Sequence, residues 1–289
     1  MIKTKLKFDR LASLLACYHI LCVPTYMNKT YNPDVFKNLS VSRKERKVYL
    51  ANLRRIGVNM RRSDKFRLDL FCLESKNLKD YFKRHGDFVS EEVQKNYLAF
   101  EPKFNRYFER VNKEIDPLIK VRRKEAQKYI NKIYDTAQKF TGVAIERAEE
   151  MHLRVLLGTA PSSRGSDIEN GKGYILIQKR NFLNPSDIFL ISMIHETVAH
   201  QTVTPYGKYF MEIFNRRTIY EIEEGFAKLF SVKIAENLLK HKVTYYIDSS
   251  EKAAYNLFDK NWPSLTDKNF ARWYKKCFQE IKHLYFSDE

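Results

Sequence analysis

Apolar residues recur at helical spacing over most of the first 140 residues. Leu11, Leu14, Leu15 and Tyr18 show the pattern, because they fall on one face of a helix with about 3.6 residues per turn. The pattern predicts a run of charged, amphipathic helices. They cover residues 9–21, 43–57, 67–84, 89–99 and 103–138, and Pro117 marks a point where the last one can break.

The pattern changes after Gly142. The segment HLRVLLG (152–158) fits either a strand or the end of a helix, and TAPSSRGSD (159–167) has the composition of a loop. The segment GKGYILIQ (171–178) predicts a strand, because glycines border a stretch of residues that favour β-structure.

A helix is predicted next, over NPSDIFLISMIHETVAHQTV. Asn184 suits its N-cap, Pro185 its first position and Asp187 its positive end, and we expect it to run to about residue 203.

The following helix is expected to begin with a T-x-x-E capping box formed by Thr218 and Glu221. Residues 243–289 again have a helical pattern, and we expect Trp262 and Trp273 in a closing core.

These elements predict a mainly α (α+β) protein. Glycine (9) and proline (8) are scarce among the 289 residues, which favours long helices over a sheet with many turns. We expect a helical N-terminal region over residues 1–140, which can cover a cleft. Residues 141–289 would then hold a small sheet and the candidate chemistry.

The net charge of +17 concerns partners rather than fold. Such a surface attracts nucleic acid, anionic lipid or an acidic protein. The basic residues lie at helical spacing between apolar ones, as in VSRKERKVYLANLRRIGVNMRR (41–62), so the simplest interpretation is solvated helix faces.

The cysteines at 17, 22, 72 and 277 form no C-x-x-C pair and fit reduced thiols in the cytoplasm. The apolar run that ends at Val23 is too short to span a bilayer, so no membrane span is expected.

His195 and His200 enclose the motif HETVAH, the first candidate for metal chemistry. A catalytic zinc takes three protein ligands and leaves one position for water. Histidines four apart differ by ~40° around a regular helix, but histidines five apart differ by ~140°. This pair can share a metal only if a one-residue π-bulge widens the helix. The alternative is a core helix with a half-buried His195 and His200 at its surface.

Glu223 and Glu224 lie in the otherwise apolar helical segment EIEEGFAKLF. Carboxylates are costly to bury unless they are paired or bind a metal. Gly225 follows, and glycine within a helix costs ~1 kcal/mol relative to alanine, so it indicates close packing. We expect the histidine helix to be the neighbour. The alternative is two exposed acids beside an incidental glycine.

Together, HExxxH and the EEGFA sequence of the next helix resemble the microtubule-associated tyrosine carboxypeptidase family, which are gluzincin zinc peptidases. A strand such as GYILIQ before the motif helix also fits that family. Dipeptidyl-peptidase III is similar in a narrower sense. The resemblance covers about residues 150–240 and is specific at the two motifs. The chain departs from the family at Thr197, Val198 and Ala199, where a glycine is usual, and in its short connection between the motifs.

The resemblance implies a gluzincin-like core that binds Zn²⁺ through His195, His200 and Glu224. Glu196 would be the general base that takes a proton from water and passes it to the leaving amine. Glu223 is the second choice for the third ligand. Otherwise it is expected to hydrogen-bond a ligand histidine.

The function that the resemblance implies is a zinc-dependent carboxypeptidase acting on peptide or protein C-termini. Tyr206 and Tyr209 are candidate donors to the developing oxyanion. The strand at 173–178 can offer its edge to an extended substrate.

A carboxypeptidase also needs a cation for the terminal carboxylate, whereas an endopeptidase does not. Arg164, Lys172, Arg216 and Arg217 are the candidates. The resembled family trims acidic tubulin tails, which a basic protein would attract. Two alternatives remain: a non-catalytic basic helical protein that binds nucleic acid or an acidic partner, and a peptidase fold that has lost activity.

Overall fold

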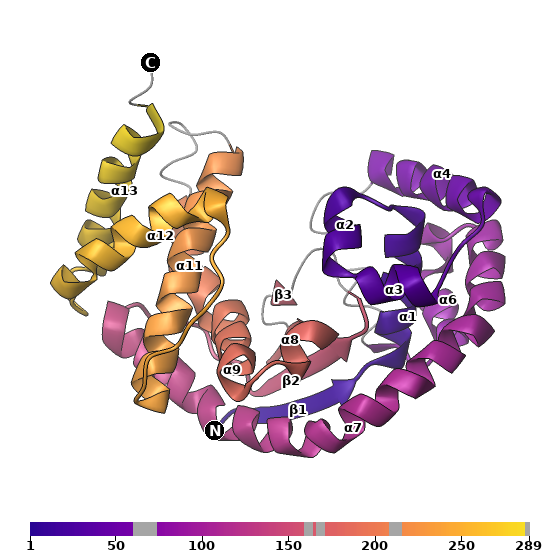
Figure 1. Ribbon diagram of the computed structural model, residues 1–289, viewed down its shortest axis with the longest axis horizontal. Coiled ribbons are helices and arrows are strands. Elements are labelled where there is room, and N and C mark those ends of the chain that lie inside the picture. Colours follow the sequence, from indigo (N-terminus) through magenta and orange to yellow (C-terminus); the bar gives the residue numbers. More distant parts are fainter. Residues whose placement is uncertain (60–73, 159–163, 166–170, 208–215, 287–289) are drawn as a thin grey trace.

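The chain folds into long helices around a small sheet, as expected for a mainly α (α+β) protein (Figure 1). The structure is a computed structural model that describes all residues except 60–73, 159–163, 166–170, 208–215 and 287–289. Across the part that is described, no helix combines the length and the apolar composition needed to cross a membrane.

The elements of the first half are β1 (Lys3–Phe8), α1 (Arg10–Cys22), α2 (Tyr26–Tyr31), α3 (Pro33–Asn38), α4 (Arg43–Asn59), α6 (Leu78–His85) and α7 (Glu91–Thr141). Those of the second half are β2 (Glu150–Leu156), β3 (Arg164–Gly165), β4 (Lys172–Gln178), α8 (Lys179–Leu183), α9 (Ser186–Ile194), a π-helical turn (His195–Ala199), α10 (His200–Gly207), α11 (Arg216–Leu239), α12 (Ser249–Asn261) and α13 (Phe270–Phe286).

The sheet has the order β1-β2-β4-β3. Strands β1, β2 and β4 are parallel, and β3 pairs antiparallel with β4. The ambiguous segment at 152–158 is thus largely strand. Strand β1 was not predicted, because its partner lies about 145 residues away and exposed lysines alternate with its inward side chains. The sheet takes β1 from the region 1–140 and the other strands from 141–289, and the division at residue 140 stays a prediction.

Helix α7 is a single helix of 51 residues, so the separate helices at 89–99 and 103–138 and the break at Pro117 were wrong. Pro102 and Pro117 both lie inside it. A buried apolar stripe continues past both prolines and supplies packing that offsets the lost backbone hydrogen bonds. The helix follows the edge of β1, where Gln127 and Asn131 hydrogen-bond the backbone of Thr4 and Ile2 at 2.9 and 3.1 Å.

The other N-terminal helices lie close to their predicted positions. Asp9 caps α1, and its carboxylate accepts a hydrogen bond from the Ala12 amide at 3.1 Å. Helix α4 covers the predicted 43–57. Residues 67–73 of the helix predicted at 67–84 lie outside the described residues, and α6 covers the end of that range, from Leu78 after an Asn77 cap.

The motif helix differs from its prediction at both ends. Pro185, not Asn184, occupies the cap of α9, and helical structure continues through α10 to Gly207 rather than ending near residue 203. Helix α11 already includes Arg216, so Thr218 lies inside the helix rather than at its predicted N-cap.

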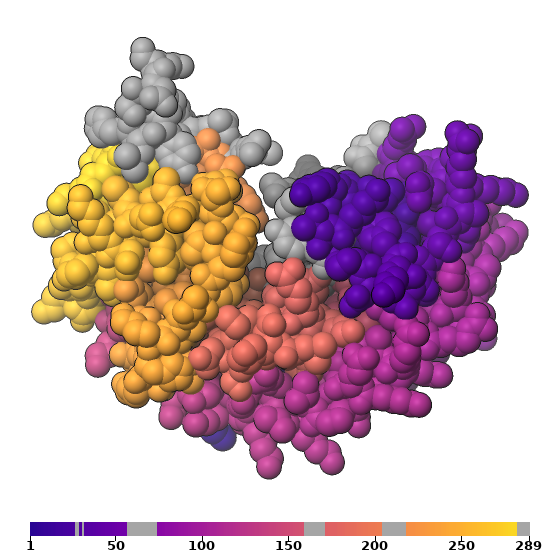
Figure 2. All heavy atoms as spheres, in the orientation of Figure 1, coloured from indigo at the N-terminus to yellow at the C-terminus, as the bar shows by residue number. Residues whose placement is uncertain are grey.

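Helices α12 and α13 close the C-terminal core against α11. Phe226 packs edge-to-face against Phe258 and Tyr274, and Trp273 is buried and contacts Trp262, as expected. Figure 2 shows a notch between this group of helices and the N-terminal helices, with α8 and neighbouring residues at its floor.

Candidate metal centre

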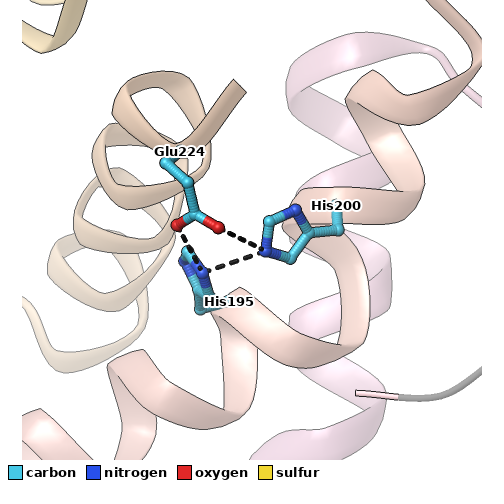
Figure 3. Close-up of side chains that lie close together, drawn as sticks. All are labelled: His195, His200 and Glu224. Carbon is cyan, nitrogen blue, oxygen red and sulfur yellow. Dashed lines mark hydrogen bonds and ion pairs between the residues drawn. The ribbon is translucent and has the colours of Figure 1, made fainter. Parts of the chain in front are cut away.

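The π-helical turn at His195–Ala199 provides the widening that histidines five apart require. It lies between α9 and α10 and turns both imidazoles toward one point (Figure 3). Their Nε2 atoms are 3.0 Å apart, and the ring planes meet at 83°. The Thr197 hydroxyl donates a hydrogen bond to the Met193 carbonyl at 2.7 Å, so this backbone oxygen just before the turn has a partner.

Glu224 reaches the same point from α11 (Figure 3). Its Oε2 lies 3.3 Å from Nε2 of His195, and its Oε1 lies 3.6 Å from Nε2 of His200. The structure therefore brings together the three residues expected as metal ligands. Glu223 lies outside this group.

The donor atoms have the spacing and the chemistry that a zinc site needs. Ligands at ~2.0–2.1 Å from a tetrahedral ion lie ~3.3 Å from one another. The three separations here are 3.0, 3.3 and 3.6 Å. Two imidazoles and one carboxylate also match a known donor set for catalytic zinc. The residues present therefore fit the ion.

The charges at the site suit a cation. Burial opposes ionisation of Glu224, but its hydrogen bond with His195 and nearby positive groups lower its pKa to about 2. Burial and the charge of His195 lower the pKa of His200 to about 4. At neutral pH the carboxylate is ionised and His200 is neutral, and these are the forms that bind metal.

His195 holds its proton more strongly than an ordinary histidine does. Burial acts to lower its pKa, but the hydrogen bond with Glu224 and the charges of Glu196 and Glu224 raise it above the ordinary value. Its Nδ1 is buried and has no hydrogen-bond partner within the described part of the chain. The orientation of this ring therefore depends on what Nε2 contacts.

The two other predicted acids lie beside the group of three. Glu196 is half-buried on the π turn, and its charge raises the pKa of His195, Tyr220 and Tyr245, so it lies within electrostatic range of all three. Glu223 is half-buried, and burial together with the charge of Glu224 raises its pKa to about 7.

Two residues of α11 that the sequence analysis missed flank Glu224. Tyr220 lies one turn before it, and partial burial together with the charge of the Glu224 carboxylate raises the pKa of its hydroxyl. Lys228 lies one turn after it and binds Asp248 at 3.2 Å and Glu251 of α12. Both positions are four residues from Glu224, and this helical spacing was the signal that could have found them.

Gly225 packs against α12, so the expectation that it faces the histidine helix was wrong. A Cβ there would lie 2.9 Å from both the Cβ of Ala254 and the carbonyl oxygen of Glu251. Close approach of two helices is the reason for this glycine.

The expected free edge of β4 is partly covered, because β3 pairs with it at Ile175 and Leu176. Lys172 is exposed at the start of β4, paired across from Glu150. The other residues expected to bind substrate cannot be placed, because Tyr209 and the side chains of Arg164, Tyr206, Arg216 and Arg217 lie outside the described residues.

Comparisons with protein-family models, with curated proteins and with solved structures found no match. The resemblance to tyrosine carboxypeptidases therefore rests on the two motifs.

Proposed function

We propose that the protein is a zinc-dependent peptidase that acts on peptide or protein C-termini. The observation that carries the proposal is the convergence of His195, His200 and Glu224 on one point at a π-helical turn. Zinc bound there would polarise the scissile carbonyl and lower the pKa of a bound water toward ~7.

The chain supplies the groups that move protons and hold the substrate. Glu196 accepts a proton from the attacking water and delivers it to the leaving amine nitrogen. It is suited to this because it lies on the same turn as His195 and remains partly exposed. Tyr245 lies within electrostatic range of Glu196 and Glu224, and its hydroxyl is the candidate donor to a developing oxyanion.

The resemblance and the charge support the choice of substrate. The resembled family trims C-termini, and a protein of net charge +17 favours acidic tails. Cytoplasmic location belongs to the same proposal, and the free, buried thiols of Cys17, Cys22 and Cys277 support it.

The test combines metal content with hydrolysis of a peptide library. Wild-type protein is expected to purify with one zinc per chain and to cleave peptides. Glu196→Gln should keep the zinc and lose cleavage, and His195→Ala should lose both. Metal-free wild-type protein, or cleavage unchanged in Glu196→Gln, would overturn the proposal. Zinc without any cleavage by the wild type would support a peptidase fold that has lost activity.

A further inference from the structure

We propose that the exposed face of α4 binds the phosphate backbone of double-stranded DNA. The inference is independent of the metal centre. It rests on how charge is distributed around this one helix.

The exposed basic side chains of α4 gather on one strip. At ~100° per residue, all the exposed positions between residues 43 and 55 fall within an arc of about 120°. They are Arg43, Lys44, Lys47, Ala51, Arg54 and Arg55. The strip extends over about 18 Å of helix, at ~1.5 Å per residue. We call it the α4 basic strip.

Acids do not neutralise the strip within the described residues. Glu45 is the only acid of α4, and it lies outside the arc. It is also engaged at the N-terminus of the helix, where its side chain accepts a hydrogen bond from the Ser42 amide at 2.6 Å. By contrast, Lys5 and Lys7 on β1 are paired with Glu150 and Asp9 at 2.7 and 2.9 Å.

The α4 basic strip destabilises the helix when nothing is bound to it. Arg43 and Lys47 are like charges four residues apart, and Lys44 and Lys47 are three apart, so both pairs repel. Arg43 and Lys44 also lie at the positive end of the helix dipole. A bound polyanion relieves both effects.

The composition of the strip favours a phosphate backbone over a protein or a membrane. Protein interfaces have a core of aromatic and large apolar side chains, and membrane-surface helices insert such residues. Apart from its five cationic side chains, the strip exposes only Ala51, which is small. The major groove of B-DNA admits an α-helix, whereas that of duplex RNA is too narrow.

Fluorescence anisotropy with a labelled DNA duplex tests the proposal over a range of salt concentrations. Five phosphate contacts give a slope of about −4.5 in log affinity against log salt, so a fourfold rise in salt should weaken binding about 500-fold. Lys47→Glu combined with Arg54→Glu should weaken binding more than tenfold and reduce the slope by about 2.

The control is Lys242→Glu combined with Lys276→Glu, which makes the same change in net charge. Both lysines are exposed, and α13, which carries Lys276, lies on the opposite side of the molecule from α4 (Figure 1). This control should change DNA affinity less than twofold. Equal losses in the two double variants would overturn the proposal, because they would show attraction by net charge alone.

Two further outcomes contradict the proposal: no DNA binding at low salt, and tighter binding of duplex RNA, an acidic peptide or anionic lipid vesicles. If the charge-reversed variant melts below the wild type, Lys47→Gln combined with Arg54→Gln replaces it and should still reduce the salt slope by about 2.

Discussion

Glu224 is the residue whose charge organises the candidate site. A carboxylate this deeply buried is unfavourable unless other groups compensate it. Here the compensation comes first from the hydrogen bond with His195 and also from the charge of Lys228, and the pKa falls to about 2. The arrangement leaves an ionised ligand facing two imidazole nitrogens.

Tyr220 is expected to hold the Glu224 carboxylate in position. Tyr220→Phe removes the hydroxyl that lies one helical turn from this ligand and is electrostatically coupled to it, and keeps the ring. Loss of a group that supports a metal ligand typically weakens metal binding by ~10-fold or more. Competition with a chromogenic chelator measures the affinity. Tyr246→Phe, at a tyrosine that is 73% exposed compared with 54% for Tyr220, is the control and should have no effect. Equal zinc affinity in Tyr220→Phe and wild type would refute this role.

Gly225 is expected to set the distance between α11 and α12. In Gly225→Ala the added methyl group meets the Glu251 carbonyl and Ala254 at 2.9 Å, so the helices must separate. The expected loss in the free energy of unfolding is about 1–3 kcal/mol, measured by urea denaturation. Gly86→Ala is the control, because the nearest atom would lie 3.7 Å away. A loss no larger than that of the control would show that the packing is not tight.

At the scale of single elements, the π turn is the feature on which the site depends. It could be anticipated, because five-residue spacing places two histidines on one metal only in a widened helix. Gly225 could be recognised as a packing residue, but not its partner, because α12 follows it by more than twenty residues. The pattern of apolar and polar residues does not show which helices pack against each other.

The same limit explains the errors in the fold. Strand β1 gains its stability from pairing with a distant segment, so nothing local predicts it. The two prolines of α7 predict breaks from local geometry, but burial of the stripe that includes Phe100 and Phe104 outweighs them. Tertiary packing decided both cases.

Thr197 is expected to stabilise the π turn. Thr197→Val keeps the shape and removes the hydrogen bond to the Met193 carbonyl. The free energy of unfolding should fall by about 1 kcal/mol. Zinc affinity should also fall, because the histidines lose their alignment. Ser231→Ala in α11 removes a comparable buried bond, to the Ala227 carbonyl at 2.6 Å, away from the turn. That control should lose similar stability and keep its zinc affinity. An unchanged affinity in Thr197→Val would mean that the turn does not need this bond.

At the scale of the molecule, the site joins segments that are far apart in the chain. Arg122 of α7 is buried and binds Ser186 at 2.6 Å and the Asn184 carbonyl at 2.6 Å, which fixes the start of α9. Glu224 approaches from α11, which Lys228 ties to α12. A metal bound here would therefore connect the π turn, α10 and α11 and add to global stability.

Removal of the metal should lower the melting temperature. A ligand present at 100 times its dissociation constant stabilises the folded state by about 2.7 kcal/mol. For a chain of this size, that corresponds to a melting temperature about 4–5 °C higher. Calorimetry with and without EDTA measures the difference. Glu196→Gln should keep the EDTA effect and His200→Ala should lack it. A wild-type melting temperature that changes neither with EDTA nor with added zinc would contradict the expected stabilisation by bound metal.

The most direct test of the central claim is an anomalous-difference map from crystals measured at the zinc absorption edge. We expect one strong peak per chain, ~2.0–2.2 Å from Nε2 of His195, Nε2 of His200 and a carboxylate oxygen of Glu224. A map without a peak at that point, or with zinc held by other residues, would contradict the account.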